Sequence, residues 1–312
     1  MRALLRRYSR EASVAAAYAA LLALLVWQAP RYYQQQFASV WVSIAPVLVL
    51  ATGMALVILA RQIDISIGWQ LSVCGVVAGL MARQGVPMPA VVALTITLGT
   101  VMGAFNGALV AFMGLPSIVV TLATMVILRQ GLAWARQGEA VYGLPADFQW
   151  FGQTQAVGQF TLVVVALGLF GAFAWGLRWL AAGRAVYAVG SDHEAARLAG
   201  IRPHRVVFGV FVLMGALAGL AAMLQSVRSP QVDPNAGKDL ELQVIAAVVV
   251  GGVAISGGRG TLVGVLLGVA LLGTIGSALV FLDVHSTWQR ALEGLIILIA
   301  VSSDALRRRA TS

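Results

Sequence analysis

Long apolar segments follow one another along nearly the whole chain, separated by short polar or glycine-rich turns. A segment of about 20 apolar residues is long enough to cross a bilayer as a helix. By this measure the pattern predicts about ten membrane-spanning helices. They are expected at residues 12–29, 38–60, 65–82, 88–113, 117–135, 159–182, 206–226, 242–257, 261–281 and 287–303. The segment 242–257 is short and rich in glycine, which favours a broken or re-entrant helix.

The composition excludes an ordinary soluble domain and a disordered chain. Of the 312 residues, 60% are hydrophobic and 11% are charged, whereas soluble domains contain about 25% charged residues. Disorder would require low hydrophobicity and high charge. Outer-membrane barrels show short alternating segments in place of the long continuous runs found here. We therefore expect an all-α polytopic membrane protein with a single transmembrane domain over residues 1–312.

The charge of the chain, +9 at pH 7, indicates how the chain is oriented. In a soluble protein such an excess would suggest a nucleic-acid partner, but in a membrane protein basic residues set the topology. We therefore expect a lipid bilayer around the chain and no nucleic acid. With ten spans and an inner amino terminus, 14 of the 21 Lys and Arg residues fall inside and seven outside. The distribution predicts that both termini are cytoplasmic.

Two connections are longer than the others. The one near 136–158 is expected on the outer face, and its aromatic residues are more typical of an interfacial belt than of a ligand site. The one near 183–205 is expected in the cytoplasm. There, Ser191 and Glu194 have the spacing of a capping box, Gly200 suits a left-handed helix end, and Pro203 prevents continuation. This pattern predicts a short capped helix, which would be either a solvated connector or an element presented to a partner protein.

Two turns carry charged residues at the ends of predicted spans. Asp64 follows the second span, where it would cap the next helix or serve a function. Arg259, next to Gly257 and Gly258, has the same two interpretations.

Three polar residues lie in or beside spans that are otherwise apolar: Asn106, Ser117 and Thr121. They would either supply neutral hydrogen-bonding groups to a solute pathway or join helices to one another. The second interpretation includes a small-x-x-x-small contact through Gly103 and Gly107.

The reactive residues are few, so no enzymatic activity, cofactor or metal is expected. Cys74 is the only cysteine, and His193, His204 and His285 are scattered along the chain. A nucleotide-binding P-loop needs a glycine five residues before its Gly-Lys pair, but position 232 is valine ahead of the only lysine, Lys238. Any coupling to ATP would therefore require a separate ATPase.

The loop 183–205 also carries the first sign of a known family. Glu194, Ala195 and Ala196, followed by Gly200, resemble the EAA-x-x-x-G cytoplasmic motif of ABC importer permeases. In that family the motif docks into the ATPase subunit.

Further segments resemble one branch of these permeases, which serves ribose, xylose, rhamnose and autoinducer-2 importers. Residues 63–68, with Asp64, Ser66 and Gly68, resemble its I-D-hydrophobic-S-hydrophobic-G signature, although Arg61 and Gln62 stand where many members have two glycines. A second signature is followed by 103–107, 116–122 and 129–131, and a third by 241–264. The matches cover most of residues 45–300 in the expected order.

The resemblance implies the permease subunit of an ATP-driven importer in the bacterial inner membrane. Its cargo would be a small sugar or sugar-like solute, such as a pentose, a deoxyhexose or autoinducer-2. Its partners would be cytoplasmic ATPase subunits, a second permease subunit in a homodimer or heterodimer, and a periplasmic solute-binding protein. The alternative is a secondary transporter or facilitator without an ATPase. Ion coupling would then need titratable pairs in the spans, and the span centres contain few candidates.

Overall fold

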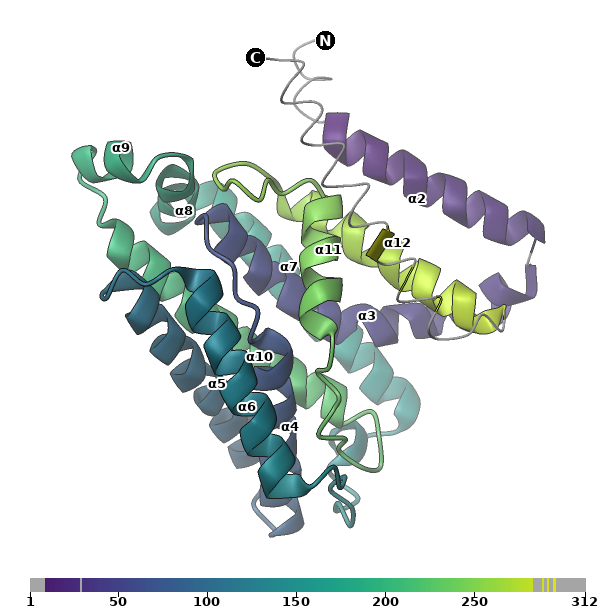
Figure 1. Ribbon diagram of the computed structural model, residues 1–312. Helices are drawn as coiled ribbons and strands as arrows, with labels where there is room; N and C mark the ends of the chain where they lie inside the picture. The colour runs from purple at the N-terminus through teal and green to yellow at the C-terminus, as the bar shows by residue number, and fades with distance from the viewer. Residues whose placement is uncertain (1–8, 29, 283–287, 289–290, 292–293, 296–312) are drawn as a thin grey trace.

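The computed structural model describes residues 9–28, 30–282, 288, 291, 294 and 295, and these form helices joined by short connections (Figure 1). The helices are α2 (Ser9–Gln28), α3 (Pro30–Leu59), α4 (Ile67–Arg83), α5 (Met88–Ala111), α6 (Ser117–Arg136), η1 (Gln149–Gly152), α7 (Gln155–Trp179), α8 (Ala181–Ser191), α9 (His193–Leu198), α10 (Pro203–Ser226), α11 (Leu240–Val250) and α12 (Leu262–Phe281). Within the described residues, extended pairing is limited to one isolated bridge between Val141 and Val232. The all-α prediction is confirmed.

Six of the described helical segments are long and apolar enough to cross a membrane. They are Ala38–Leu59, Met88–Ala111, Ser117–Arg136, Gln155–Trp179, Pro203–Ser226 and Leu262–Phe281. Three shorter apolar helices cover Glu11–Trp27, Ile67–Arg83 and Leu240–Val250. The chain is thus a multi-pass membrane protein. The tenth expected helix, 287–303, falls almost wholly outside the described residues, as do the termini, so ten spans and two cytoplasmic ends stay predictions.

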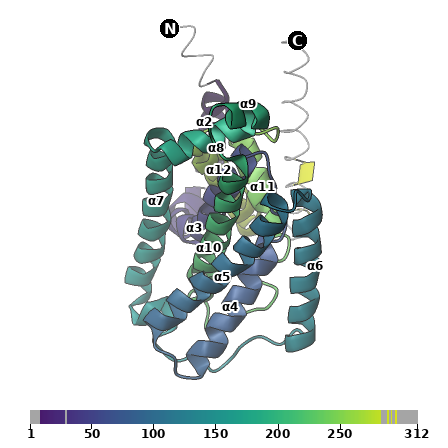
Figure 2. The same cartoon turned by 90° about the vertical axis from the view of Figure 1, so that its left-hand side faces the viewer.

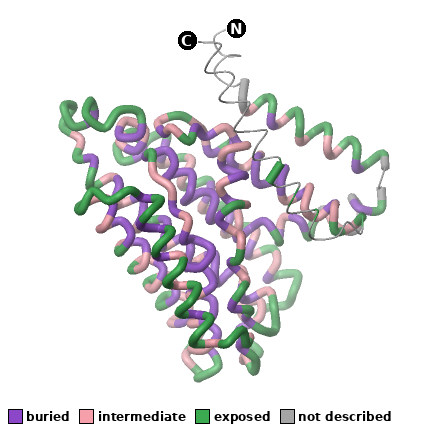
Figure 3. Tube along the Cα trace, in the orientation of Figure 1, coloured by how far each residue is buried: buried purple, intermediate pink, exposed green. Residues whose placement is uncertain are grey.

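The helices form a buried centre with exposed flanks. In the most apolar part of α3, 89% of the residues are buried, compared with 61% in α10 and only 17% in α7. Helices α6 and α7 lie at opposite sides of the bundle (Figure 2). Exposed positions run along both helices, and Figure 3 shows those of α6. Apolar side chains on such flanks are suited to contact with lipid or with another membrane protein.

Helices α5 and α10 cross in close contact because glycines face each other. A Cβ added to Gly103 would overlap the carbonyl oxygen of Phe211, and one added to Gly215 would overlap that of Gly99. Small residues at such a crossing let two backbones approach closely. The structure therefore places the predicted small-residue contact of Gly103 and Gly107 within the chain, between α5 and α10.

Two helices begin inside the bundle. The linker 60–66 runs from the end that carries α8 and α9, called here the α9 end, inward to the start of α4 (Figure 1). Helix α11 has only 11 residues, so it is about 16 Å long, roughly half of a bilayer core. This is the short helix expected over 242–257, although it ends already at Val250. The backbones meet at Gly68 and Gly237, since a Cβ on either would overlap the carbonyl oxygen of the other.

Candidate functional site

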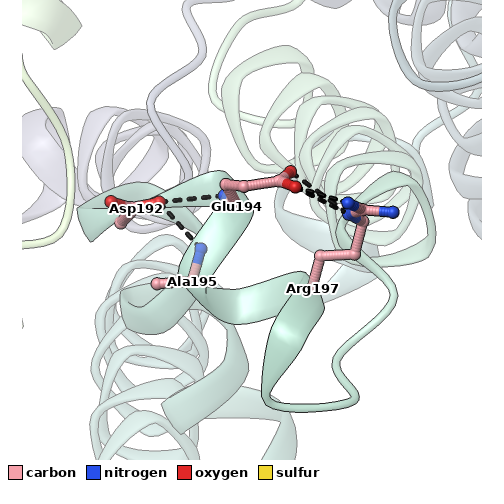
Figure 4. Close-up of polar contacts among 4 residues, drawn as sticks. All are labelled: Asp192, Glu194, Ala195 and Arg197. Carbon is pink, nitrogen blue, oxygen red and sulfur yellow. Dashed lines mark hydrogen bonds and ion pairs between the residues drawn. The ribbon is translucent and has the colours of Figure 1, made fainter.

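The predicted loop 183–205 is mostly helical, and the short helix α9 projects from one end of the bundle (Figure 1). Its cap differs from the predicted one. Asp192 is the N-cap, and its Oδ1 accepts hydrogen bonds of 2.9 Å from the amides of Glu194 and Ala195 (Figure 4). Ser191 is the last residue of α8, so the capping box of Ser191 with Glu194 was wrong. An Asx cap one residue later fulfils the same need, because the first amides of a helix have no partner within it.

The side chain of Glu194 is free of any capping role and pairs with Arg197 one turn later (Figure 4). Both side chains are exposed. The Arg197 guanidinium lowers the pKa of Glu194, because it donates hydrogen bonds to the carboxylate and attracts its charge. An exposed pair of this kind contributes little to stability, so both groups are available to a partner.

The other residues of the predicted motif define two sides of α9. Ala196 is buried against the bundle, whereas Ala195 is exposed and Leu198 is 80% exposed. Gly200 has φ +83°, the predicted left-handed conformation at a helix end. The helix therefore presents a small, partly apolar face with a charged pair to the surroundings.

Backbone contacts tie the α8–α9 segment to two other turns at the α9 end. The amide of Gly258 donates a 2.9 Å hydrogen bond to the carbonyl oxygen of Leu59, the last residue of α3. A Cβ on Gly190 would overlap that same oxygen. The hydroxyl of Tyr187 in α8 donates to the carbonyl oxygen of Gly260 over 2.8 Å. The end of α3, α8 and the turn 254–261 thus meet in one joint next to α9.

The turn 254–261, which lies in the third family signature, depends on glycine for its backbone conformation. Gly257 and Gly258 have φ values of +80° and +68°, and a Cβ on Gly258 would overlap Ser191. Arg259 is exposed, and its carbonyl oxygen accepts a bond from Ala254. These positions form a compact turn at the joint.

A buried network of polar side chains lies deeper in the bundle, beside the linker 60–66. Asp64 is fully buried, and its Oδ1 accepts bonds from the amide of Ser66 at 2.9 Å and from its hydroxyl at 2.6 Å. The amide group of Gln70 donates to the Ser66 hydroxyl over 2.8 Å and to Asp64 Oδ2 over 3.4 Å. Asp64 therefore orders the turn before α4, as an Asx residue does.

The three polar residues predicted in the spans belong to this network. Asn106 donates to the Ser66 hydroxyl over 3.0 Å and accepts from Thr124 over 2.7 Å. Ser117 and Thr121 accept bonds from the amides of Ile63 and Ile65 at 3.2 and 3.1 Å. In this conformation their hydrogen bonds hold the linker 60–66 against α5 and α6.

Four residues of this region were missed by sequence reasoning. Single polar or aromatic residues in apolar helices look like ordinary packing, so Trp69, Gln70 and Thr124 drew no proposal of a site. The position of Glu241 at a predicted span end favours a solvated anchor, but its side chain is 7% exposed. Two spacings were a usable signal, because Ser66 with Gln70 and Thr121 with Thr124 each lie one helical turn apart.

The position of one basic residue differs from the predicted one. Arg129, counted as an outer residue, places its guanidinium 5.7 Å from the ring centre of Trp69 at the start of α4. It therefore lies along the bundle and not in the outer loop.

Within the described part of the chain, no three His, Cys, Asp or Glu side chains gather as a metal site. His285 lies outside the described residues.

This arrangement of apolar helices, with the half-length helix α11 and the projecting capped helix α9, is that of a multi-pass membrane protein. Residues 36–301 match the family described as the permease component of branched-chain amino acid transport systems. The chain belongs to this family, in the branch of sugar and autoinducer-2 permeases that its motifs resemble.

Curated relatives match over nearly the full chain. The autoinducer 2 import system permease protein LsrC of Salmonella typhi is 35% identical over 306 residues, which cover 96% of this chain and 87% of the relative. LsrC of Enterobacter sp. (strain 638) is 33% identical and covers 97% and 88%. LsrC of Escherichia coli O157:H7 is also 33% identical and covers 93% and 86%. No solved structure matches the chain.

Proposed function

We propose that the protein is the transmembrane permease subunit of an ATP-driven ABC importer in the bacterial inner membrane. The observation that carries the proposal is helix α9, which projects from the bundle yet is attached to it by backbone contacts. Its exposed Glu194–Arg197 pair and Ala195 offer a docking surface, and Gly200 ends it sharply. The α9 end would then be cytoplasmic, facing a separate ATPase subunit.

The joint at Gly190 and Gly258 provides a mechanical route from the ATPase to the membrane. A displacement of α9 would be passed through α8 to the end of α3, because Gly190 of α8 packs against the carbonyl oxygen of Leu59. From there the linker 60–66 leads to the network around Asp64 and Asn106. Close-packed backbone contacts transmit such shifts because they leave no space to absorb them.

The proposed cargo is a small sugar-like solute, and autoinducer-2 is the first candidate because the relatives are autoinducer-2 import permeases. Pentoses and deoxyhexoses are the other candidates. A periplasmic solute-binding protein would deliver the cargo to the end opposite α9. A second permease subunit, identical or different, would complete the pathway, and no cofactor is proposed for the permease itself.

A secondary transporter is the second candidate, and one observation favours it. Asp64 and Glu241 are buried acids, 0% and 7% exposed, and ion-coupled carriers use such groups. In the ABC proposal, Asp64 instead orders the turn before α4.

Uptake by sealed vesicles distinguishes the two. Vesicles containing the permease are prepared with and without its ATPase subunits, and accumulation of labelled autoinducer-2 delivered by the binding protein is measured. The ABC proposal expects accumulation only with ATPase and ATP. Accumulation without ATPase, or accumulation driven by a proton gradient, would contradict it. The ligand that copurifies with the binding protein identifies the cargo.

A further inference from the structure

Arg61 occupies the left-handed backbone position that ends α3. Its φ is +62°, in the region where glycine is the usual residue. The amide of Arg61 donates to the carbonyl oxygen of Ile58 over 2.8 Å, and the amide of Gln62 donates to that of Val57 over 2.9 Å. This is the bonding pattern of a Schellman helix end, where any residue with a Cβ is unfavourable. Glycine would fit this turn better, so the presence of an arginine points to a use of its side chain.

The backbone of Arg61 is fixed at the joint, whereas its side chain is exposed. A Cβ on Gly257 would lie 2.8 Å from the Cβ of Arg61 and 2.8 Å from the carbonyl oxygen of Gly190. Arg259 lies two residues further along the same turn, and both arginines are exposed. Among the residues that the structure describes, neither forms an ion pair. A charged group on a fixed backbone is suited to a partner, because little freedom is lost on binding.

The exposed charges of the α9 end are mostly basic. The exposed arginines of this end are Arg61, Arg178, Arg184, Arg197, Arg202, Arg205 and Arg259. The acids described there are already bonded within the chain: Glu11 to Thr261, Asp64 to Ser66, Asp192 to the first amides of α9, and Glu194 to Arg197. The excess of positive charge favours an acidic partner surface.

Membrane topology by itself does not explain Arg61. Arginines on the cytoplasmic side fix the orientation of a membrane protein, but they do so from any backbone conformation. An arginine in the next position of the linker would serve topology equally well and would leave the left-handed position to glycine. A specific contact, in contrast, requires the guanidinium at one point in space.

We propose that Arg61, with Arg259 beside it, forms a second docking contact for the ATPase subunit and receives a carboxylate of that subunit. The inference rests on the proposed function, in which α9 makes the first contact. A guanidinium binds a carboxylate through two parallel hydrogen bonds. Because Arg61 directly follows α3, this contact joins the ATPase to α3 and to the linker 60–66 without passing through α9.

The proposal predicts opposite effects of one substitution on stability and on docking. Arg61→Gly should raise the midpoint of thermal unfolding by a few degrees, because glycine adopts the left-handed conformation without strain. The same variant should slow the association of the ATPase subunit severalfold at low salt, and the difference from the unsubstituted protein should shrink at high salt. Both are measured on the permease in phosphatidylcholine nanodiscs, with the purified ATPase subunit as the probe.

Gln137→Gly is the matched control. Gln137 is an exposed residue with φ +50° that ends α6, at the opposite end of the bundle (Figure 1). It should raise the unfolding midpoint in the same way and leave ATPase association unchanged. Equal association of Arg61→Gly and Gln137→Gly would overturn the proposal. So would a loss that occurs only in nanodiscs containing phosphatidylglycerol, because Arg61 would then bind lipid headgroups.

Crosslinking tests whether the partner group is a carboxylate. Lys238 is the only lysine, so Arg61→Lys in a Lys238→Arg background gives a single lysine side chain and keeps the charge. A carbodiimide joins an amine to a carboxylate that it contacts, without a spacer. We expect a covalent adduct of permease and ATPase subunit from Arg61→Lys. Arg83→Lys, at the exposed end of α4 opposite α9, should give none (Figure 1).

The two proposals fail in different ways. An ATPase subunit that binds Arg61→Gly normally, with no adduct from Arg61→Lys, would reject the second contact and leave docking through α9 intact. An ATPase subunit that does not bind the unsubstituted permease at all would reject the proposed function and, with it, the role of Arg61. The gain in thermal stability of Arg61→Gly would still be expected, since it depends on the backbone alone.

Discussion

The amide nitrogen of Gly258 lies 2.9 Å from the carbonyl oxygen of Leu59 and donates a hydrogen bond to it, at the point where α3 ends. Gly190 packs against the same oxygen without room for a side chain. Three segments far apart in the sequence thus share one joint beside α9. If α9 docks an ATPase, this joint determines how much of its movement reaches the membrane.

Replacing Gly190 with alanine should uncouple the joint. The added methyl group would overlap the Leu59 carbonyl, so α8 must move away from α3. We expect ATPase subunits still to copurify and ATP-dependent uptake to fall about tenfold, as for a shift near 1.4 kcal/mol. Gly171→Ala is the control, because a Cβ there meets nothing within 4 Å. Equal uptake by both variants would show that the joint does not transmit coupling.

Gly200→Ala should weaken ATPase docking, because alanine is strained at φ +83°. The left-handed conformation costs a residue with a Cβ about 1 kcal/mol. Asparagine tolerates this conformation better, so Gly200→Asn should recover most of the binding. Copurification of the ATPase and cargo-stimulated ATP turnover are the measurements. Two variants with identical losses would mean that any side chain at this position is harmful, whatever its tolerance of the left-handed conformation.

Asp192→Ala should destabilise α9, whereas Ser191→Ala should not. Loss of the Asp192 cap leaves the amides of Glu194 and Ala195 without their bonds and costs about 1 kcal/mol. Hydrogen exchange of these two amides is expected to accelerate severalfold in Asp192→Ala only. The reverse ranking would restore the capping box of Ser191 with Glu194.

Thr124→Val should destabilise the buried network. Its hydroxyl donates to Asn106 Oδ1, and loss of this donor leaves a buried acceptor unpaired, which costs about 1–3 kcal/mol. Thermal unfolding in detergent is the measurement. Thr97→Val is the matched control, because the exposed Thr97 hydroxyl bonds only to Ala93 in its own helix. Equal midpoints for the two variants would mean that the bond of Thr124 to Asn106 contributes nothing to stability.

Local signals predicted most of the helices and missed the details of caps and contacts. The helix expected at 261–281 forms over Leu262–Phe281, and Gly200 ends α9 as expected, because apolar length and glycine conformation act locally. The capping residue was misassigned by one position, since Ser191 and Asp192 are both good caps. The choice between them depends on where α8 ends, and α8 is held by contacts with Leu59 and Gly258.

The sequence by itself determined that the chain is an all-helical membrane protein and, through its motifs, which family it resembles. Apolar length and the spacing of Glu194, Ala195, Ala196 and Gly200 are properties of contiguous residues. Only the tertiary structure decided that Asp64 and Asn106 are joined through Ser66, and that Gly68 and Gly237 meet backbone to backbone. Both results depend on the distance between segments separated by up to about 170 residues in the chain, which packing sets and periodicity does not encode.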